Sequence, residues 1–125
     1  MGTDSIQPFI NMAVQEEKGV FVLVKTSNPS SVEISEATSI YGEKIRYWLA
    51  SYVHMVGKNC VGRYGYSGIG AVVGATFPKE ASLLRNRMKN NFFLVPGFGA
   101  QGGGAKDMQK EVYRELGKHY SHMEY

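Results

Sequence analysis

Hydrophobic residues along this chain follow two patterns, the spacing of an amphipathic helix and the short unbroken run of a buried strand. Unbroken runs at residues 20–24, 70–75 and 92–95 predict three strands. Helical spacing predicts one helix that ends before Gly19 and a long helix, after the first strand, that ends at Gly57. The apolar positions that mark these two helices are Ile6, Phe9, Ile10, Ala13, Val14, Tyr41, Ile45, Trp48, Leu49, Tyr52, Val53 and Val56.

Two further helices complete the predicted order of elements. Thr76 and Pro78 suit the N-cap and first turn of a short helix that runs to Met88. The last predicted helix carries the apolar residues Met108, Val112, Leu116 and Tyr120. Strands and helices therefore alternate, which predicts an α/β fold with a parallel sheet and right-handed crossovers. The run at residues 20–24 has the composition of a strand buried on both faces, as parallel strands under helices are.

Each predicted strand is followed by a distinctive loop, KTSNPSS, GATFP or PGFGAQGGG. The carboxyl ends of parallel strands meet at one edge of a sheet, and in α/β folds this edge carries the chemistry. We therefore expect the three loops to line one rim. Three strands cannot close a barrel, so we also expect the apolar strands to face a core that this chain only half builds.

The loop after the third strand carries the strongest chemical signal. The apolar run breaks at Pro96, and residues 97–104 include five glycines before helix-favouring sequence resumes. Glycine lets backbone N–H groups converge on an anion, and a following helix N-terminus favours negative charge. A phosphorylated small molecule is therefore the leading ligand hypothesis.

Two alternatives for the glycine loop stay open at this point. The loop spells Gly97-x-Gly99-x-x-Gly102, which matches the dinucleotide-binding fingerprint, but no later apolar run supplies the second strand that this motif needs. In the other alternative, the glycines only form a tight turn.

Composition narrows the function classes. The formal charge of +3 is small, and the 14 Lys and Arg residues are interspersed with acidic ones, so we expect no nucleic-acid partner. The longest apolar run, residues 20–24, is far shorter than the roughly 20 residues of a membrane span, so we expect no membrane partner and no export signal. A single cysteine, Cys60, excludes an internal disulfide, and we interpret it as an incidental thiol of a cytoplasmic protein.

The segments FVLVKTSNPSS, GAVVGAT and LVPGFGAQGG, in this order and spacing, resemble the later part of orotidine 5'-phosphate decarboxylase in one bacterial branch of that family. The opening DSIQPF is similar to the start of the helix after the fourth barrel strand. The resemblance covers about Asp4 to Asp107. It implies a partial (β/α)8 TIM barrel that contains strands five to seven, with residues 1–125 as an incomplete domain and residues 108–125 as a tail that departs from the family pattern.

The resemblance also implies which residues bind substrate. Ser27 corresponds to the serine that hydrogen-bonds the pyrimidine ring, and Pro96 to the proline that closes the pocket beside the base. Gln101 corresponds to the glutamine that reaches the 5'-phosphate, and its neutral amide can donate to a phosphate oxygen. The backbone near that phosphate belongs to Gly99, Gly102 and Gly103.

Two departures from the family pattern concern the chemistry. The family uses an Asp-x-Lys-x-x-Asp motif on its third strand and needs no metal or cofactor, but neither aspartate of this chain, Asp4 or Asp107, has a lysine two residues later. We therefore assign no catalytic residue here, and we expect Lys25 to be a strand-end lysine with its head group in solvent. The family's phosphate-clamping arginine, on the eighth strand, also has no counterpart after Asp107.

Three functions follow as alternatives. The chain belongs to an enzyme that converts orotidine 5'-phosphate to uridine 5'-phosphate, or it is a catalytically inactive remnant that still binds such nucleotides. It is otherwise an independent phosphate-binding or interaction module. For a half-built barrel we expect the isolated chain to self-associate, to pair with a complementary barrel fragment or to remain partly molten, because its core needs a cover.

Overall fold

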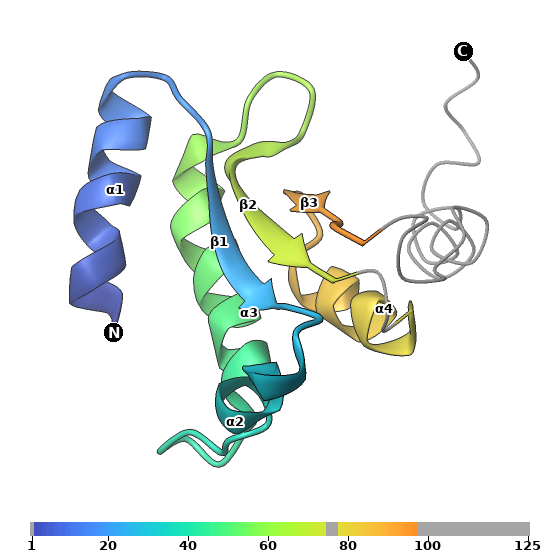
Figure 1. Ribbon diagram of the computed structural model, residues 1–125. Coiled ribbons are helices and arrows are strands. Elements are labelled where there is room, and N and C mark those ends of the chain that lie inside the picture. The colour runs from blue at the N-terminus through green and yellow to red at the C-terminus, as the bar shows by residue number, and fades with distance from the viewer. Residues whose placement is uncertain (1, 75–77, 98–125) are drawn as a thin grey trace, which may run out of the picture.

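The centre of the molecule is a parallel sheet of three strands. The computed structural model describes residues 2–74 and 78–97, and the strands lie in the order β1-β2-β3 (Figure 1). Their bounds are β1 (Val20–Lys25), β2 (Ser67–Val73) and β3 (Asn91–Leu94). The register pairs Val22 with Ala71, and Ala71 with Phe93. The parallel arrangement predicted from the alternation of elements is thus confirmed.

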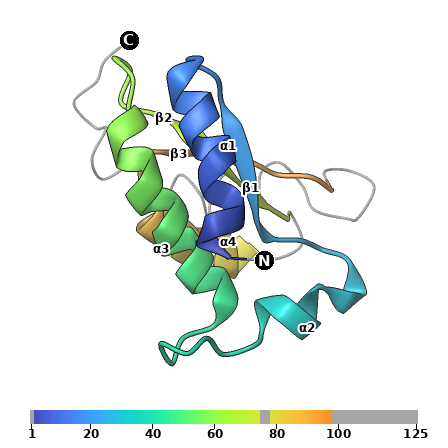
Figure 2. The same ribbon diagram turned by 90° about the vertical axis from the view of Figure 1, so that its left-hand side faces the viewer.

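Helices cover one face of this sheet. The helical elements are α1 (Thr3–Gln15), η1 (Pro29–Ser31), α2 (Val32–Ser35), α3 (Ile45–Gly57), η2 (Lys58–Cys60) and α4 (Pro78–Arg87). Figure 2 shows α1 and α3 side by side in front of the strands, and α3 contacts all three strands as well as α4. None of the helices within the described ranges is long and apolar enough to cross a membrane.

The hydrophobic core lies between the helices and alternate residues of the strands. A strand points successive side chains to opposite faces, so every second residue faces α3. The strand residues on this side are Val20, Val22, Val24, Ile69, Ala71, Val73 and Phe93. Their main partners are the helical residues Ile10, Ala13, Ala50, Val53, Ala81 and Leu84, and Met88 directly after α4.

One buried polar side chain joins three elements of this core. Asn91 Nδ2 donates hydrogen bonds to the carbonyl oxygens of Ile69, at 2.7 Å, and Val53, at 3.4 Å. The first residue of β3 is thereby tied to β2 and α3. The donor side of this buried amide is thereby paired with backbone acceptors, as buried donors usually are.

The opposite face of the sheet is bare within the described residues. Phe21, Leu23, Phe92 and Leu94 point to this face and are 48, 62, 51 and 51% exposed. The prediction that residues 20–24 are buried on both faces is therefore wrong, because the helices of the described ranges cover one side of β1 and leave Phe21 and Leu23 exposed on the other. We call these four side chains the bare apolar face.

The long helix begins later than predicted. Its first residue is Ile45, and Tyr41 lies outside it and is exposed. Thr38 and Lys44 form an isolated antiparallel bridge, and Gly42 between them has φ +79°, so the chain makes a tight turn here. A turn with a left-handed residue cannot continue as a helix, which is why the helical spacing of Tyr41 is misleading.

Candidate functional site

The carboxyl ends of the three strands form one rim, as the sequence predicts. Ser27 follows β1 by two residues, Gly74 follows β2 directly, and Pro96 follows β3 by two residues. Because the strands are parallel neighbours in the order β1-β2-β3, these three positions occur at the same edge of the sheet (Figure 1).

Ser27 packs directly against the end of β2. A β-carbon on Gly74 would lie 3.3 Å from the backbone nitrogen of Ser27 and 3.4 Å from its β-carbon. The N–H of Gly74 also donates a hydrogen bond of 2.8 Å to the carbonyl of Lys25. A glycine at position 74 therefore lets the loop after β1 approach β2 closely. Sequence reasoning did not single out Gly74, although a glycine directly after a buried strand is a signal for such an approach.

The loop that carries Ser27 is shaped by its own polar side chains. Thr26 Oγ1 donates to Asn28 Oδ1 at 2.7 Å, and Asn28 Nδ2 donates to Ser30 Oγ at 3.0 Å. Ser31 Oγ donates back to the carbonyl of Thr26 at 3.0 Å. Asparagine and serine commonly form such local bonds with nearby loop groups. The bonds give the loop a defined shape and leave the Ser27 side chain half-buried at the rim.

Lys25 does not extend into solvent, so that prediction is wrong. Only 2% of Lys25 is exposed. Its Nζ donates to Ser35 Oγ at 2.9 Å and to Glu36 Oε1 at 3.3 Å. A lysine can remain charged inside a protein only when acceptors replace its water, and Ser35 and Glu36 supply them here.

The Glu36 carboxylate forms ion pairs with two further cationic side chains. Arg46 Nη1 lies 2.5 Å from Glu36 Oε1, and Lys44 Nζ lies 2.5 Å from Glu36 Oε2. On its other side, Arg46 Nη2 pairs with Glu80 Oε1 at 3.0 Å. Hydrogen bonds from Arg46, Lys44 and Lys25, in that order of effect, lower the pKa of the Glu36 carboxyl from 4.5 to about 2. The carboxylate is therefore ionised throughout the physiological pH range.

Pro96 and Gly97 open the predicted phosphate loop. Pro96 is exposed at the rim, and Gly97 has φ +98°, a left-handed conformation that favours glycine. The other predicted loop residues, Gly99, Gln101, Gly102 and Gly103, lie outside the described residues, so their roles stay predictions.

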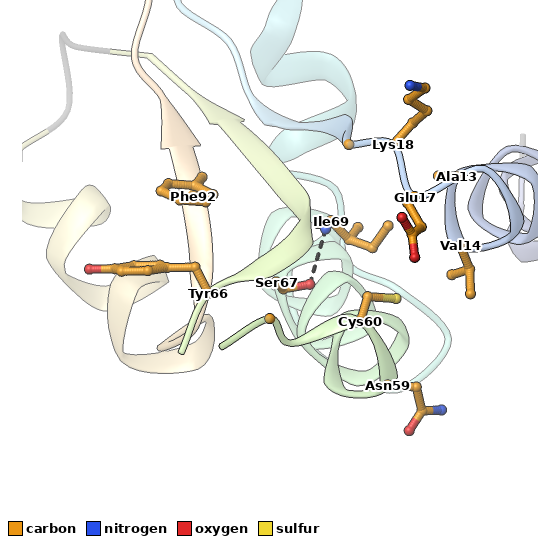
Figure 3. A pocket seen from close by; sticks show the side chains of 13 residues that line it. Ala13, Val14, Glu17, Lys18, Asn59, Cys60, Tyr66, Ser67, Ile69 and Phe92 are labelled. Carbon is orange, nitrogen blue, oxygen red and sulfur yellow. Dashed lines mark hydrogen bonds between the residues drawn. The ribbon is translucent and has the colours of Figure 1, made fainter. Parts of the chain in front are cut away.

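A cavity lies at the opposite end of the strands. It has a volume of about 540 Å³, and its lining includes Ser67, the first residue of β2. Figure 3 shows the stacked rings of Tyr66 and Phe92, 4.6 Å apart, on one side of it and Glu17 on the other. The dashed line joins Ser67 Oγ to the backbone N–H of Ile69, at 3.0 Å. This cavity is therefore distinct from the rim that carries Ser27.

Metal chemistry finds no support in the part of the chain that the structure describes. No three His, Cys, Asp or Glu side chains there lie close enough together to hold a metal ion. Cys60 is half-buried, and its thiol donates weakly to the carbonyl of Val56 at 3.7 Å.

Comparison with known proteins decides the family. A model of the orotidine 5'-phosphate decarboxylase / HUMPS family matches residues 1–122. The chain belongs to this family. An orotidine 5'-phosphate decarboxylase from Caldicellulosiruptor bescii is 44% identical over 116 residues, which are 87% of this chain and 35% of that protein. One from Clostridium perfringens is 44% identical over 108 residues, 86% of this chain and 38% of that protein.

Solved structures of the same family share the fold. A Leishmania donovani orotidine monophosphate decarboxylase, 32% identical, gives a TM-score of 0.63 over 89% of this chain and 39% of its own. A candidate orotidine monophosphate decarboxylase from Toxoplasma gondii, 29% identical, gives a TM-score of 0.74 over 89% of this chain and 42% of its own. The chain therefore spans well under half of the decarboxylases that it matches, and its fold is part of a TIM barrel.

The partial barrel accounts for the bare apolar face. In a TIM barrel the helices form an outer ring, and the inward side chains of all eight strands fill the interior. In this chain the helix-covered face corresponds to the outside of the barrel, and Phe21, Leu23, Phe92 and Leu94 correspond to its interior filling.

Proposed function

We propose that this chain supplies the pyrimidine-binding and phosphate-binding loops of an orotidine 5'-phosphate decarboxylase, which forms uridine 5'-phosphate in de novo pyrimidine synthesis. The observation that supports this most directly is the contact between Ser27 and Gly74 on the rim that Pro96 and Gly97 also border. In the proposal, Ser27 hydrogen-bonds the pyrimidine, Pro96 lies beside the base, and Gln101 donates to the 5'-phosphate, with the backbone of Gly99, Gly102 and Gly103 nearby.

We propose further that this chain binds nucleotide without decarboxylating it by itself. The family's chemistry depends on a lysine flanked by aspartates, and Asp4 and Asp107, the two aspartates here, are not part of such a motif. A general acid and preorganised charges usually supply most of the barrier reduction. The alternative to a part of an active decarboxylase is a catalytically inactive remnant or a phosphate-binding module.

The protein partner in this proposal is a complementary part of the barrel. The proposed compartment is the cytoplasm. The chain spans 35% of its relative from Caldicellulosiruptor bescii, and its bare apolar face lacks a cover within the described residues. Apolar side chains exposed together on a sheet favour association with a partner surface.

Titration of the purified chain with uridine 5'-phosphate, ribose 5-phosphate and adenosine 5'-phosphate tests the proposal. Followed by calorimetry, uridine 5'-phosphate should bind more tightly than ribose 5-phosphate, because only the nucleotide presents a pyrimidine to Ser27. It should also bind more tightly than the purine nucleotide. Equal affinity for all three would indicate a phosphate-binding module, and no binding at all would refute the nucleotide site.

A further inference from the structure

One carboxylate connects the two ends of the loop that carries Ser27. Lys25, the last residue of β1, and Glu36, directly after α2, are eleven positions apart and joined by an ion pair of 3.3 Å. The segment between them contains Ser27. Glu36 also pairs with Lys44 and Arg46, which flank the first residue of α3. A single side chain therefore attaches the beginning of the loop, its end and the start of α3 to one another.

The bonds inside the loop cannot replace this attachment. Thr26, Asn28, Ser30 and Ser31 bond only to one another in the contacts described above, so they shape the loop without anchoring it. The beginning of the loop is also attached by the backbone bond from Gly74 to Lys25, and its end by the bonds that Ser35 accepts from Lys25 and Arg46. Glu36 is the charged anchor at its far end.

Burial makes the attachment sensitive to the charge of Glu36. Lys25 and Arg46 are 2% and 4% exposed, so neither can regain full hydration without a movement of the chain around it. If the carboxylate became neutral, Lys25 and Arg46 would lose its negative charge, while Ser35 would remain among the acceptors of Lys25, and Arg46 would keep Glu80 and the carbonyl of Ser35. Removing one partner of a buried ion pair costs more than the pair itself contributes. Opening of the segment next to Lys25 would let water solvate the ammonium group.

We propose that Glu36 is a positioning residue for pyrimidine recognition, because its contacts with Lys25, Lys44 and Arg46 hold the Ser27 loop against the end of β2. This inference rests on the proposed function for the role of Ser27. Glu36 itself contacts no ligand in this proposal. Its loss should affect recognition of the base and leave recognition of the phosphate, which the glycine loop provides, unchanged.

The test compares Glu36→Gln with Glu43→Gln. The two carboxylates have the same exposed fraction, 33%, but the Glu43 carboxylate pairs with Arg87, which lies outside the Ser27 loop. Hydrogen exchange of residues 26–35 should rise about tenfold or more in Glu36→Gln, between the effects expected for exposed and buried pairs. It should stay at the wild-type rate in Glu43→Gln.

Ligand affinities give the second measurement. In Glu36→Gln, the preference for uridine 5'-phosphate over ribose 5-phosphate should fall, while the dissociation constant for ribose 5-phosphate stays the same. Equal losses for both ligands would mean that Glu36 supports the whole domain, which overturns the proposal. Unchanged hydrogen exchange in residues 26–35 overturns it too.

The experiment also covers the cases in which Glu36→Gln does not fold or the wild-type chain binds no ligand. If Glu36→Gln does not fold, Lys25→Met replaces it, since this change removes the buried charge but keeps most of the side-chain volume, and it should raise exchange in the same segment. If the wild-type chain binds neither ligand, the proposed function fails, and hydrogen exchange alone then decides whether Glu36 holds the loop.

Discussion

The side-chain amide of Asn91 occupies the space that a β-carbon on Gly57 would need. Such a carbon would lie 2.8 Å from Asn91 Nδ2 and 2.6 Å from Ser67 Oγ. Ser67 Oγ also donates to the carbonyl of Gly57 at 2.9 Å. The end of α3 therefore approaches β2 and β3 so closely that only a residue without a side chain fits.

Gly57→Ala should accordingly destabilise the domain, by about 1 to 3 kcal/mol, the usual range for overpacking a core. The inserted methyl group would push against Ser67 and Asn91, two buried side chains that hydrogen-bond backbone carbonyls. Urea denaturation followed by circular dichroism measures the change. Gly62→Ala is the control, because its β-carbon would meet nothing closer than 3.7 Å, and a similar loss in both variants would contradict the steric explanation.

Acid should weaken the fold through Glu36. The pKa of this carboxyl is about 2 in the folded chain, below its ordinary value of 4.5, so its stabilising contribution is complete above about pH 4.5 and is lost as the pH falls towards 2. The charges that face it are Lys25, Lys44 and Arg46. The urea midpoint of the wild type should therefore decrease between about pH 5.5 and about pH 3.

Glu36→Gln should have a lower midpoint at the higher pH and a smaller decrease on acidification. Glu43→Gln, which keeps the Glu36 cluster, should show the same decrease as the wild type. Parallel pH profiles for Glu36→Gln and the wild type would show that this carboxylate is not responsible for the acid sensitivity.

Gln101→Ala should weaken the binding of uridine 5'-phosphate by about 1 to 3 kcal/mol if the amide donates to the charged phosphate. The matched change Gln15→Ala, at an exposed position of α1, should have no effect. Isothermal titration calorimetry measures both. Superimposable titration curves for the two variants would indicate that the glycine loop is only a turn and does not bind the phosphate.

The chain by itself should not convert orotidine 5'-phosphate to uridine 5'-phosphate above the uncatalysed rate. The reason is that neither Asp4 nor Asp107 has the lysine that the family's proton-donating motif requires. Loss of the orotate absorbance in a long incubation measures the rate. Any turnover that scales with protein concentration would disprove the claim that the chain is inactive because it lacks this motif.

Self-association should follow from the bare apolar face when the chain is isolated. Leu23, 62% exposed on that face, is the natural position for a test. Leu23→Glu should shift sedimentation towards the monomer, because a charge cannot be buried there without a partner. Ile40→Glu, in an exposed loop, is the control. A wild type that sediments as a monomer and melts sharply would rule out this use of the face.

Local sequence patterns predicted most of the described fold because they depend on spacing. The runs at residues 20–24 and 92–95 and the stops at Gly19 and Gly57 predicted where strands and helices occur. Tyr41 was misassigned because helical spacing continues through a turn that Gly42 makes by its left-handed conformation.

The environment of Lys25 could not be predicted in the same way. Its partners, Ser35 and Glu36, lie in a segment with no regular hydrophobic pattern, and they meet Lys25 only because α2 folds back towards the end of β1. Local sequence patterns also could not predict the bare apolar face, because an unbroken apolar run does not show whether one side of a strand or both sides are covered. The rim residues Ser27 and Pro96 came from the family resemblance, and the structure adds Gly74 to them.

The burial of Lys25 has a practical consequence for experiments on this protein. An amine-reactive reagent would modify the exposed lysines, such as Lys58, Lys79 and Lys89, long before it reached an ammonium group that is 2% exposed. The labelling rate of Lys25 therefore reports how often the neighbouring segment opens, since local opening must come first. The natural side chain of Lys25 can therefore be used to measure opening of the loop beside it, without an engineered residue.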